Sequence, residues 1–338
     1  MPSTTPRFRR TVTLITLVAI SALCLAACAV SSPKAPSSSP ETSITYAVPL
    51  TIAAAPAYVA DSQGFWKQEG LDVKLKLFNS GRQALDALLG HDAEVMSVSE
   101  TPPLRAALQG QSIRWIATVT EHHEAKLTVR TNVISKPGDF IGRKVGTVTG
   151  TNSDYYMYRW LEANHISTDQ VQIVPFTDPQ VMVQSFVQGD IDAMFAWEPY
   201  NYTATSQLPK LSASWPTTLY SGRHSIIMNA DYLSTHKKAA EQIIRGFVKA
   251  EQFIKDHPAE SKAIVEKATG VDAKALDSLW ADYVVKVELD DGLHSILGDE
   301  AAWITKTDGS GTPPNLEGFV DAGPMEAVAP GRVGTDYK

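Results

Sequence analysis

Cysteine is almost absent from this sequence of 338 residues. Its two cysteines, Cys24 and Cys28, lie near the N-terminus, so no disulfide, cysteine-rich zinc site or thiol nucleophile can form farther along the chain. A surplus of positive charge is missing as well, because 37 acidic residues stand against 30 basic ones, and the basic ones are scattered. Nucleic-acid-binding proteins usually gather lysine and arginine on one face. We therefore expect no nucleic-acid partner.

Long apolar runs are also lacking, with one exception at the N-terminus. Arg7, Arg9 and Arg10 precede the uncharged residues 11–27, which end in Leu25-Ala26-Ala27-Cys28. A positive segment, an apolar segment and small residues before a cysteine are typical of a bacterial lipoprotein signal peptide. We expect cleavage that removes residues 1–27 and lipidation of Cys28. A plain signal peptide or a single membrane anchor is the alternative.

The segment after Cys28 is expected to be a tether. Residues 28–42 are rich in serine and proline and cannot bury a core. Two or more acyl chains hold a protein stably at a membrane, where one chain does not. We therefore expect an extracytoplasmic protein that the lipid on Cys28 anchors to the bacterial membrane, at the cell surface or in the periplasm. No later apolar run approaches the roughly 20 residues of a spanning helix.

The remaining sequence alternates short apolar runs with helical patterns, which is typical of βαβ units. In a first half we predict strands at 43–47, 71–78, 93–98, 113–119 and 126–129, and helices at 57–69, from 81 onward and at 101–109. A second half has strands at 144–148, 171–175 and 191–197 and helices at 153–164 and 179–188. A strand at 225–228 and helices at 237–256, 259–269 and 273–284 follow, before a segment punctuated by glycine and proline. This order predicts two α/β lobes.

Several motifs occur in an order that is known from one family. Among them are Glu69-Gly70-Leu71-Asp72-Val73 and Trp197-Glu198-Pro199-Tyr200. Over about residues 44–333 the chain resembles the nitrate, sulfonate and taurine class of ABC-transporter solute-binding proteins. The resemblance implies the type II periplasmic-binding-protein fold, in which two α/β lobes joined by two crossover segments close on a central ligand cleft. It places lobe 1 at 43–130 and 222–338 and lobe 2 at 131–221.

The same resemblance implies a function. The protein would close around a small molecule of the aliphatic sulfonate, taurine or nitrate type and deliver it to the permease and ATPase subunits of an ABC importer. We expect no enzyme and no cofactor, because the chain has no recognisable catalytic motif and lacks the cysteine-rich motif of the related fungal pyrimidine-synthesis proteins. Two alternatives stay open: a binder of a pyrimidine or another heterocyclic, thiamine-precursor-like ligand, and a ligand-sensing receptor domain.

Candidate ligand-binding residues gather where strands end and helices begin. Residues 150–154, 80–82 and 99–101 hold such positions, where free N–H groups and hydroxyls suit a small anion. Helix capping is the alternative for each. Trp197 would add a flat apolar wall. The expected ligand-binding residues are Thr51, Ser80, Gly81, Arg82, Ser99, Glu100, Thr101, Glu121, Thr151, Asn152, Ser153, Asp154, Trp197, Glu198 and His224.

The acidic members of this set leave the charge of the ligand open. Asp154 or Glu100 could hold the amine of a zwitterion such as taurine, or could merely complement a helix dipole. A metal site is not expected. His122 and His123 lie beside Glu121 and Glu124, but neighbouring residues of a strand point to opposite sides, and no further ligand cluster is evident.

Overall fold

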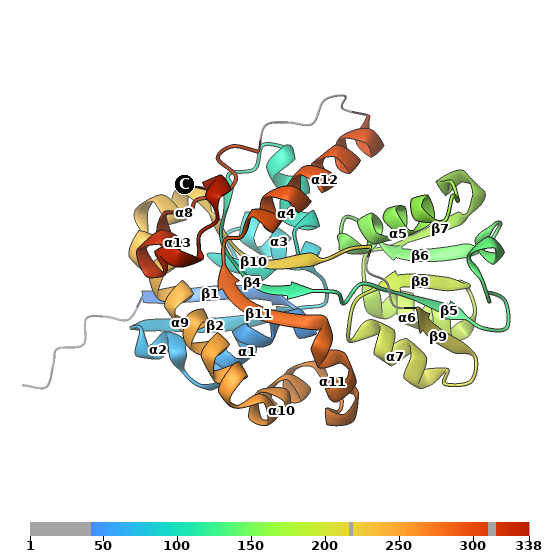
Figure 1. Ribbon diagram of the computed structural model, residues 1–338, viewed down its shortest axis with the longest axis horizontal. Helices are drawn as coiled ribbons and strands as arrows, with labels where there is room; N and C mark the ends of the chain where they lie inside the picture. The colour runs from blue at the N-terminus through green and yellow to red at the C-terminus, as the bar shows by residue number, and fades with distance from the viewer. Residues whose placement is uncertain (1–41, 216–218, 310–315, 338) are drawn as a thin grey trace, which may run out of the picture. The chain divides into compact units, whose positions relative to one another are not determined.

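The computed structural model describes residues 42–215, 219–309 and 316–337, which form two β-sheets with helices packed on both (Figure 1). The expected signal peptide, the lipidation of Cys28 and nearly all of the tether fall on residues 1–41, outside the described residues. Among the described helices, none combines the length and the apolar character that crossing a membrane requires.

The elements follow one another in three stretches. The first contains β1 (Thr42–Pro49), the 3₁₀ turn η1 (Ile52–Ala54), α1 (Ala55–Ser62), α2 (Phe65–Gln68), β2 (Leu71–Phe78), α3 (Gly81–Leu89), β3 (Val95–Val98), α4 (Thr101–Leu108) and β4 (Ile113–His122). The second contains β5 (Lys126–Arg130), β6 (Lys144–Val148), α5 (Asn152–Ala163), β7 (Gln172–Phe176), α6 (Pro179–Gln188), β8 (Ala193–Ala196), α7 (Tyr200–Gln207) and β9 (Ser212–Trp215). The third contains β10 (Gly222–Asn229), α8 (Ala230–Thr235), α9 (Lys237–Asp256), α10 (Pro258–Thr269), α11 (Ala273–Leu279), the 3₁₀ turn η4 (Trp280–Asp282), β11 (Tyr283–Glu288), α12 (Asp291–Asp308) and α13 (Gly323–Val328).

Strand pairing divides the chain into two lobes. The six-stranded sheet has the order β11-β4-β10-β3-β1-β2, and we call it, with its helices, lobe 1. The five-stranded sheet has the order β7-β6-β8-β5-β9 and defines lobe 2. In the first sheet β1, β2 and β3 are parallel, β10 pairs antiparallel with β3 and β4, and β11 pairs antiparallel with β4. In the second sheet β6, β7 and β8 are parallel, and β5 pairs antiparallel with β8 and β9. The chain leaves lobe 1 after β4 and returns at β10, as the predicted two-lobed α/β fold class requires.

Several elements differ from the prediction. The strand at 126–129 was expected in lobe 1, but β5 pairs with β8 and β9 of lobe 2. The helix expected at 57–69 is two helices, because Gly64 adopts a left-handed conformation with φ 65°. The helix expected at 273–284 ends at Leu279, and β11 begins at Tyr283. Helices α7, α12 and α13 and strand β9 were not predicted at all.

An aromatic cluster packs α2 and α9 against β1. Tyr46 of β1 stacks on Trp66 of α2, with ring centroids 5.4 Å apart, and Phe247 of α9 meets Trp66 edge to face at 5.3 Å. A Cβ atom on Gly246 would lie 2.2 Å from Trp66 Cδ1, so only glycine lets α9 approach this closely. Burial of such large rings stabilises lobe 1 strongly.

The two lobes touch through side chains. The Trp197 indole donates to the carbonyl of Leu50 at 3.3 Å, and the Tyr200 hydroxyl donates to the carbonyl of Asn79 at 2.7 Å. The Asn79 amide in turn donates to Asp178 at 2.9 Å. These bonds join the loops after β1 and β2 to α6 and to the segment around α7. The two lobes are therefore in direct contact at these loops.

Candidate functional site

A small cavity of about 20 Å³ lies between the two lobes, which is space for about one water molecule. Its walls come from the ends of β1, β3 and β8, from the starts of α3, α4 and α5, from the segment after β4 and from β10. Ligands bind at this edge of open α/β sheets. The lining residues are Pro49, Thr51, Gly81, Val98, Ser99, Pro102, Glu124, Thr151, Asn152, Trp197 and His224. Seven of the expected ligand-binding residues thus meet in one cavity.

Residues at the helix starts beside this cavity cap those helices, as the sequence suggested. The Thr151 hydroxyl accepts from the Ser153 N–H at 3.2 Å and donates to the carbonyl of Val148 at 2.7 Å, so it begins α5 while it lines the cavity. Gly81 brings the start of α3 close to β3, since a Cβ atom there would lie 2.3 Å from Val98 Cγ2. Capping and cavity lining are therefore combined at Thr151 rather than alternatives.

Among the residues that the structure describes, one acid lines the cavity, namely Glu124. Its Oε2 accepts from the Thr51 hydroxyl at 2.7 Å and from the Tyr283 hydroxyl at 3.0 Å. Burial raises the pKa of Glu124 to about 8, so the side chain is mostly protonated at pH 7. An anion in the cavity would therefore not meet a full negative charge at this position.

Two neutral histidines lie at the cavity: His224 lines it, and His122 lies beside Glu124. The Nε2 atom of His122 is 2.9 Å from Ser99 Oγ, and the Nε2 atom of His224 is 3.1 Å from Ser97 Oγ. Burial lowers the pKa of His224 to about 3 and lowers the pKa of His122 well below its ordinary value of 6.5. Both imidazoles are fully buried and uncharged at neutral pH.

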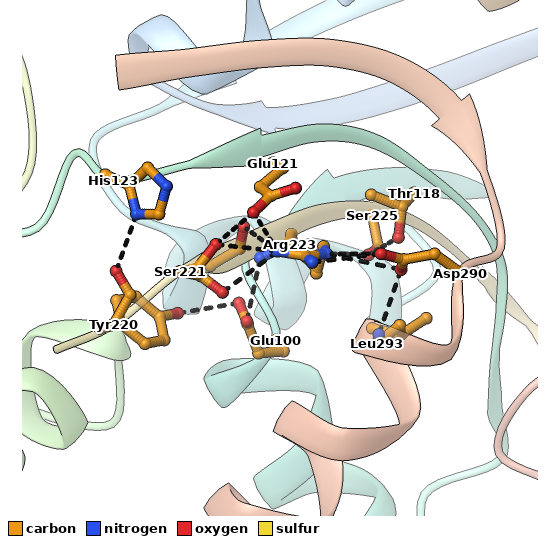
Figure 2. Close-up of polar contacts among 11 residues, drawn as sticks. Glu100, Thr118, Glu121, His123, Tyr220, Ser221, Arg223, Ser225, Asp290 and Leu293 are labelled. Carbon is orange, nitrogen blue, oxygen red and sulfur yellow. Dashed lines mark hydrogen bonds and ion pairs between the residues drawn. The ribbon is translucent and has the colours of Figure 1, made fainter. Parts of the chain in front are cut away.

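The two acids that left the ligand charge open in the sequence accept hydrogen bonds within the protein. Asp154 accepts from the Thr147 hydroxyl at 2.8 Å and from the Gly150 N–H at 2.6 Å, and it shapes the turn before α5. Burial raises the pKa of Asp154. Figure 2 shows Glu100, which accepts from the Tyr220 hydroxyl and from the Arg223 N–H, both at 2.9 Å. Neither carboxyl group lines the cavity.

The other expected residues lie near the cavity but face elsewhere. Glu121 accepts from Ser221 at 2.6 Å and pairs with Arg223 at 3.3 Å, as Figure 2 also shows. Arg82 is exposed, pairs with Asp86 at 3.1 Å and borders a separate groove of about 510 Å³. The remaining four are buried and outside the cavity lining: Ser80 caps α3, Thr101 begins α4, Ser153 donates to the carbonyl of Phe195, and Glu198 pairs with Lys126.

Sequence reasoning missed four lining residues: Pro49, Val98, Pro102 and Glu124. Glu124 was considered only as part of a metal cluster. Its position is set by the Tyr283 hydroxyl of β11, a strand that the sequence did not reveal, and by Thr51 at the end of β1. No local pattern brings together residues that are 73 and 159 positions apart in the sequence.

Known proteins resemble this chain in sequence and in fold. Residues 51–261 match the family described as NMT1/THI5 like, which is more than half of the chain. The chain belongs to the NMT1/THI5-like family. Within its relatives, the taurine-binding periplasmic protein of Escherichia coli is 29% identical over 158 residues, which cover 45% of this chain and 49% of that protein. The match thus spans about half of the length of that relative.

Solved structures of the same fold include binding proteins and an enzyme. The alkanesulfonate-binding protein of Xanthomonas axonopodis pv. citri, solved with MOPS bound, has a TM-score of 0.72 and 15% identity over 83% of this chain and 98% of that one. The desulfurization enzyme DSZB has a TM-score of 0.63 and 14% identity over 85% of this chain and 98% of that one. Similarity at this level establishes the fold of the NMT1/THI5-like chain and leaves its activity to the site.

Proposed function

We propose that this protein is the solute-binding component of an ABC importer and that it holds a small anion or zwitterion of the aliphatic sulfonate, taurine or nitrate type between its lobes. The observation that carries this proposal is that strand ends and helix starts of both lobes meet at one cavity. Its volume of about 20 Å³ means that the lobes have to separate to admit such a molecule. Its walls offer hydroxyls and helix starts, which favour anions, and its acid is mostly protonated at pH 7. The relatives named for taurine and alkanesulfonate binding support the same ligand class.

Closure of the lobes fits a receptor better than a catalyst. Trp197 lines the cavity from lobe 2 and hydrogen-bonds to lobe 1, so ligand contact and lobe contact depend on the same side chain. A ligand that binds both lobes stabilises the closed form and thereby marks the protein as loaded for a permease. We infer that permease and ATPase subunits are its partners.

A ligand screen tests the proposal. We expect taurine, ethanesulfonate or nitrate at millimolar concentration to raise the melting temperature, because a ligand that binds only the folded state stabilises it by mass action. Trp197→Ala should weaken the dissociation constant of the best ligand about 10- to 100-fold, since it removes a cavity wall and an interlobe bond. Trp280→Ala, outside the cavity, is the matched control. If none of these compounds, but a pyrimidine, stabilises the protein, the heterocycle alternative is correct.

We also infer that Cys28 carries the lipid that holds the protein at the extracytoplasmic side of the membrane. The Leu25-Ala26-Ala27-Cys28 sequence after an apolar segment supports this inference. The protein expressed in a bacterium should partition into the detergent phase of a Triton X-114 extract, and the Cys28→Ser variant should not be lipidated. An intact-mass measurement that finds an unmodified Cys28 in the processed chain would contradict it.

A further inference from the structure

Three polar side chains form a chain whose two ends line the cavity. Ser99 Oγ lies 2.9 Å from His122 Nε2, and His122 Nδ1 lies 3.7 Å from Glu124 Oε1. Ser99 and Glu124 both line the cavity, and all three side chains are buried. Among the described residues, His122 Nδ1 has no hydrogen-bond partner, so Glu124 Oε1 is a polar atom within reach of it after a small adjustment. The chain thus begins and ends at the ligand site.

Hydrogen-bond directions follow from the partners of Glu124. Two hydroxyls, those of Thr51 and Tyr283, donate to Oε2, so the proton of the neutral acid belongs on Oε1 and faces His122 Nδ1. Nδ1 is then the acceptor nitrogen of a neutral imidazole, and Nε2 carries the hydrogen and donates to Ser99 Oγ. Ser99 therefore has its own hydrogen free to donate into the cavity.

This polarity is the reverse of that in a hydrolytic triad. There an ionised carboxylate accepts from Nδ1–H, and the imidazole withdraws the serine hydrogen. Here a protonated acid fixes the other tautomer and leaves serine a donor. The geometry favours recognition of an anionic oxygen over nucleophilic attack by Ser99.

We propose that Ser99 donates a hydrogen bond to an anionic oxygen of the ligand, that His122 and Glu124 are positioning residues which hold it in the donor state, and that ionisation of Glu124 reverses the chain. This proposal rests on the proposed function, because it assigns a binding role within the same cavity. On ionisation, the Glu124 proton leaves to solvent, and the imidazole hydrogen moves from Nε2 to Nδ1 with His122 still neutral. Nε2 then accepts the Ser99 hydrogen, and Ser99 offers only lone pairs to the ligand.

The protonation states at neutral pH agree with the donor arrangement. Burial raises the pKa of Glu124 to about 8 and lowers that of His122 well below 6.5. The ionisable groups that face the three side chains come from several elements: Tyr58 of α1, Glu100 at the start of α4, His123 after β4, Lys126 of β5, Glu198 before α7, Tyr220, Arg223 and His224 at β10, and Tyr283 of β11. Lys126 and Glu198 act on Glu124 with opposite signs.

Glu300 supplies a matched control. It is a fully buried acid on α12 whose pKa burial raises well above 4.5, but it does not line the cavity. Glu300→Gln removes a titrating buried carboxyl of the same type without touching the chain. Glu124→Gln, in contrast, keeps an oxygen for Thr51 and Tyr283 and places an N–H donor toward His122 Nδ1. That variant should therefore lock Ser99 in its donor state.

The experiment is calorimetric titration of the full chain with ethanesulfonate between pH 6.5 and 9.5. We expect the wild-type dissociation constant to weaken about tenfold per pH unit above pH 8, because one proton is linked to binding. For Glu124→Gln the dissociation constants at pH 6.5 and pH 9.5 should agree within about threefold, whereas Glu300→Gln should weaken with pH as the wild type does. Ser99→Ala should bind about 10- to 100-fold more weakly at pH 6.5.

The outcomes separate this proposal from the function on which it rests. Two results would overturn only the proposed role of the Ser99–His122–Glu124 chain. One is wild-type binding that does not change with pH, and the other is a Glu124→Gln variant that keeps the wild-type pH dependence. Full affinity in a folded Ser99→Ala variant would also overturn it. If the wild type does not bind ethanesulfonate at any pH, the proposed function is wrong for this ligand, and so is the proposed role of the Ser99–His122–Glu124 chain.

Discussion

Replacing Lys126 with methionine is expected to lower the free energy of unfolding by about 3–5 kcal/mol, the range for removing one partner of a buried ion pair. The Lys126 ammonium is nearly buried and lies 3.4 Å from Glu198 and 2.9 Å from Asp282. Glu198 is itself 2% exposed, and burial raises its pKa, so without Lys126 its carboxyl group would lose its nearest cation in a low-dielectric site. The ion pair of Lys126 with Asp282 also joins β5 of lobe 2 to η4 of lobe 1.

Urea unfolding followed by circular dichroism measures this loss. Lys262→Met is the matched control, because Lys262 pairs with Asp277, whose side chain is 70% exposed, and such surface pairs contribute less than about 1 kcal/mol. The double variant Lys126→Met/Glu198→Gln should recover part of the loss, since it removes the uncompensated charge together with its partner. Equal losses of unfolding free energy in Lys126→Met and Lys262→Met would show that the buried pair contributes no more to stability than the surface pair.

The second large effect is a fall in stability between pH 6.5 and pH 8. Burial raises the pKa of Glu100 to about 7, that of Glu124 to about 8 and that of Glu300 well above 4.5. A raised folded-state pKa gives stability that is complete below the unfolded value of 4.5 and is lost as pH rises through the folded value. His122 and His224 have lowered pKa values, so they act in the opposite sense, but only below 6.5.

Above pH 6.5 the acids therefore act without that opposition. Each acid that is protonated when folded and ionised when unfolded lowers the free energy of unfolding by about 1.4 kcal/mol per pH unit. We expect a total loss of several kcal/mol, measurable as urea midpoints at pH 6.5, 7.5 and 8.5. Glu300→Gln should reduce the slope by about one acid's share, whereas Glu326→Gln, at an exposed position on α13, should leave it unchanged. A wild-type midpoint that stays constant or rises over this range would contradict the prediction.

Residues that determine local structure could be identified from the sequence. Thr151 was predicted to begin a helix at a strand end, and it caps α5 while it lines the cavity. Gly81, Ser99, Asn152, Trp197, Thr51 and His224 were predicted on similar local grounds or by family resemblance, and they line the same cavity. Asp154 and Glu100 were chosen by the same reasoning, but both carboxyl groups accept hydrogen bonds from neighbouring elements instead.

The fold shows the same division between local and distant information. The strand at 126–129 was recognised from its apolar pattern, but its membership in lobe 2 depends on pairing with β8 and β9. The sequence predicts a helix up to residue 284 and no strand at 283–288, because the neighbours of that strand, β4 and Glu124, lie more than 150 residues away in the sequence. Apolar periodicity reports which side chains are buried and carries no information about the partner.

By itself, then, the sequence determined the two-lobed α/β fold class, most of the strand ends and the family, because helix caps, apolar periods and motifs are local properties. Only the tertiary structure decided which side chains face the cavity between the lobes. Glu124 lines this cavity because β4, β11 and the loop after β1 bring His122, Tyr283 and Thr51 around it. Its protonation, and with it the donor role proposed for Ser99, follows from burial, which is a property of the assembled lobes and not of any segment alone.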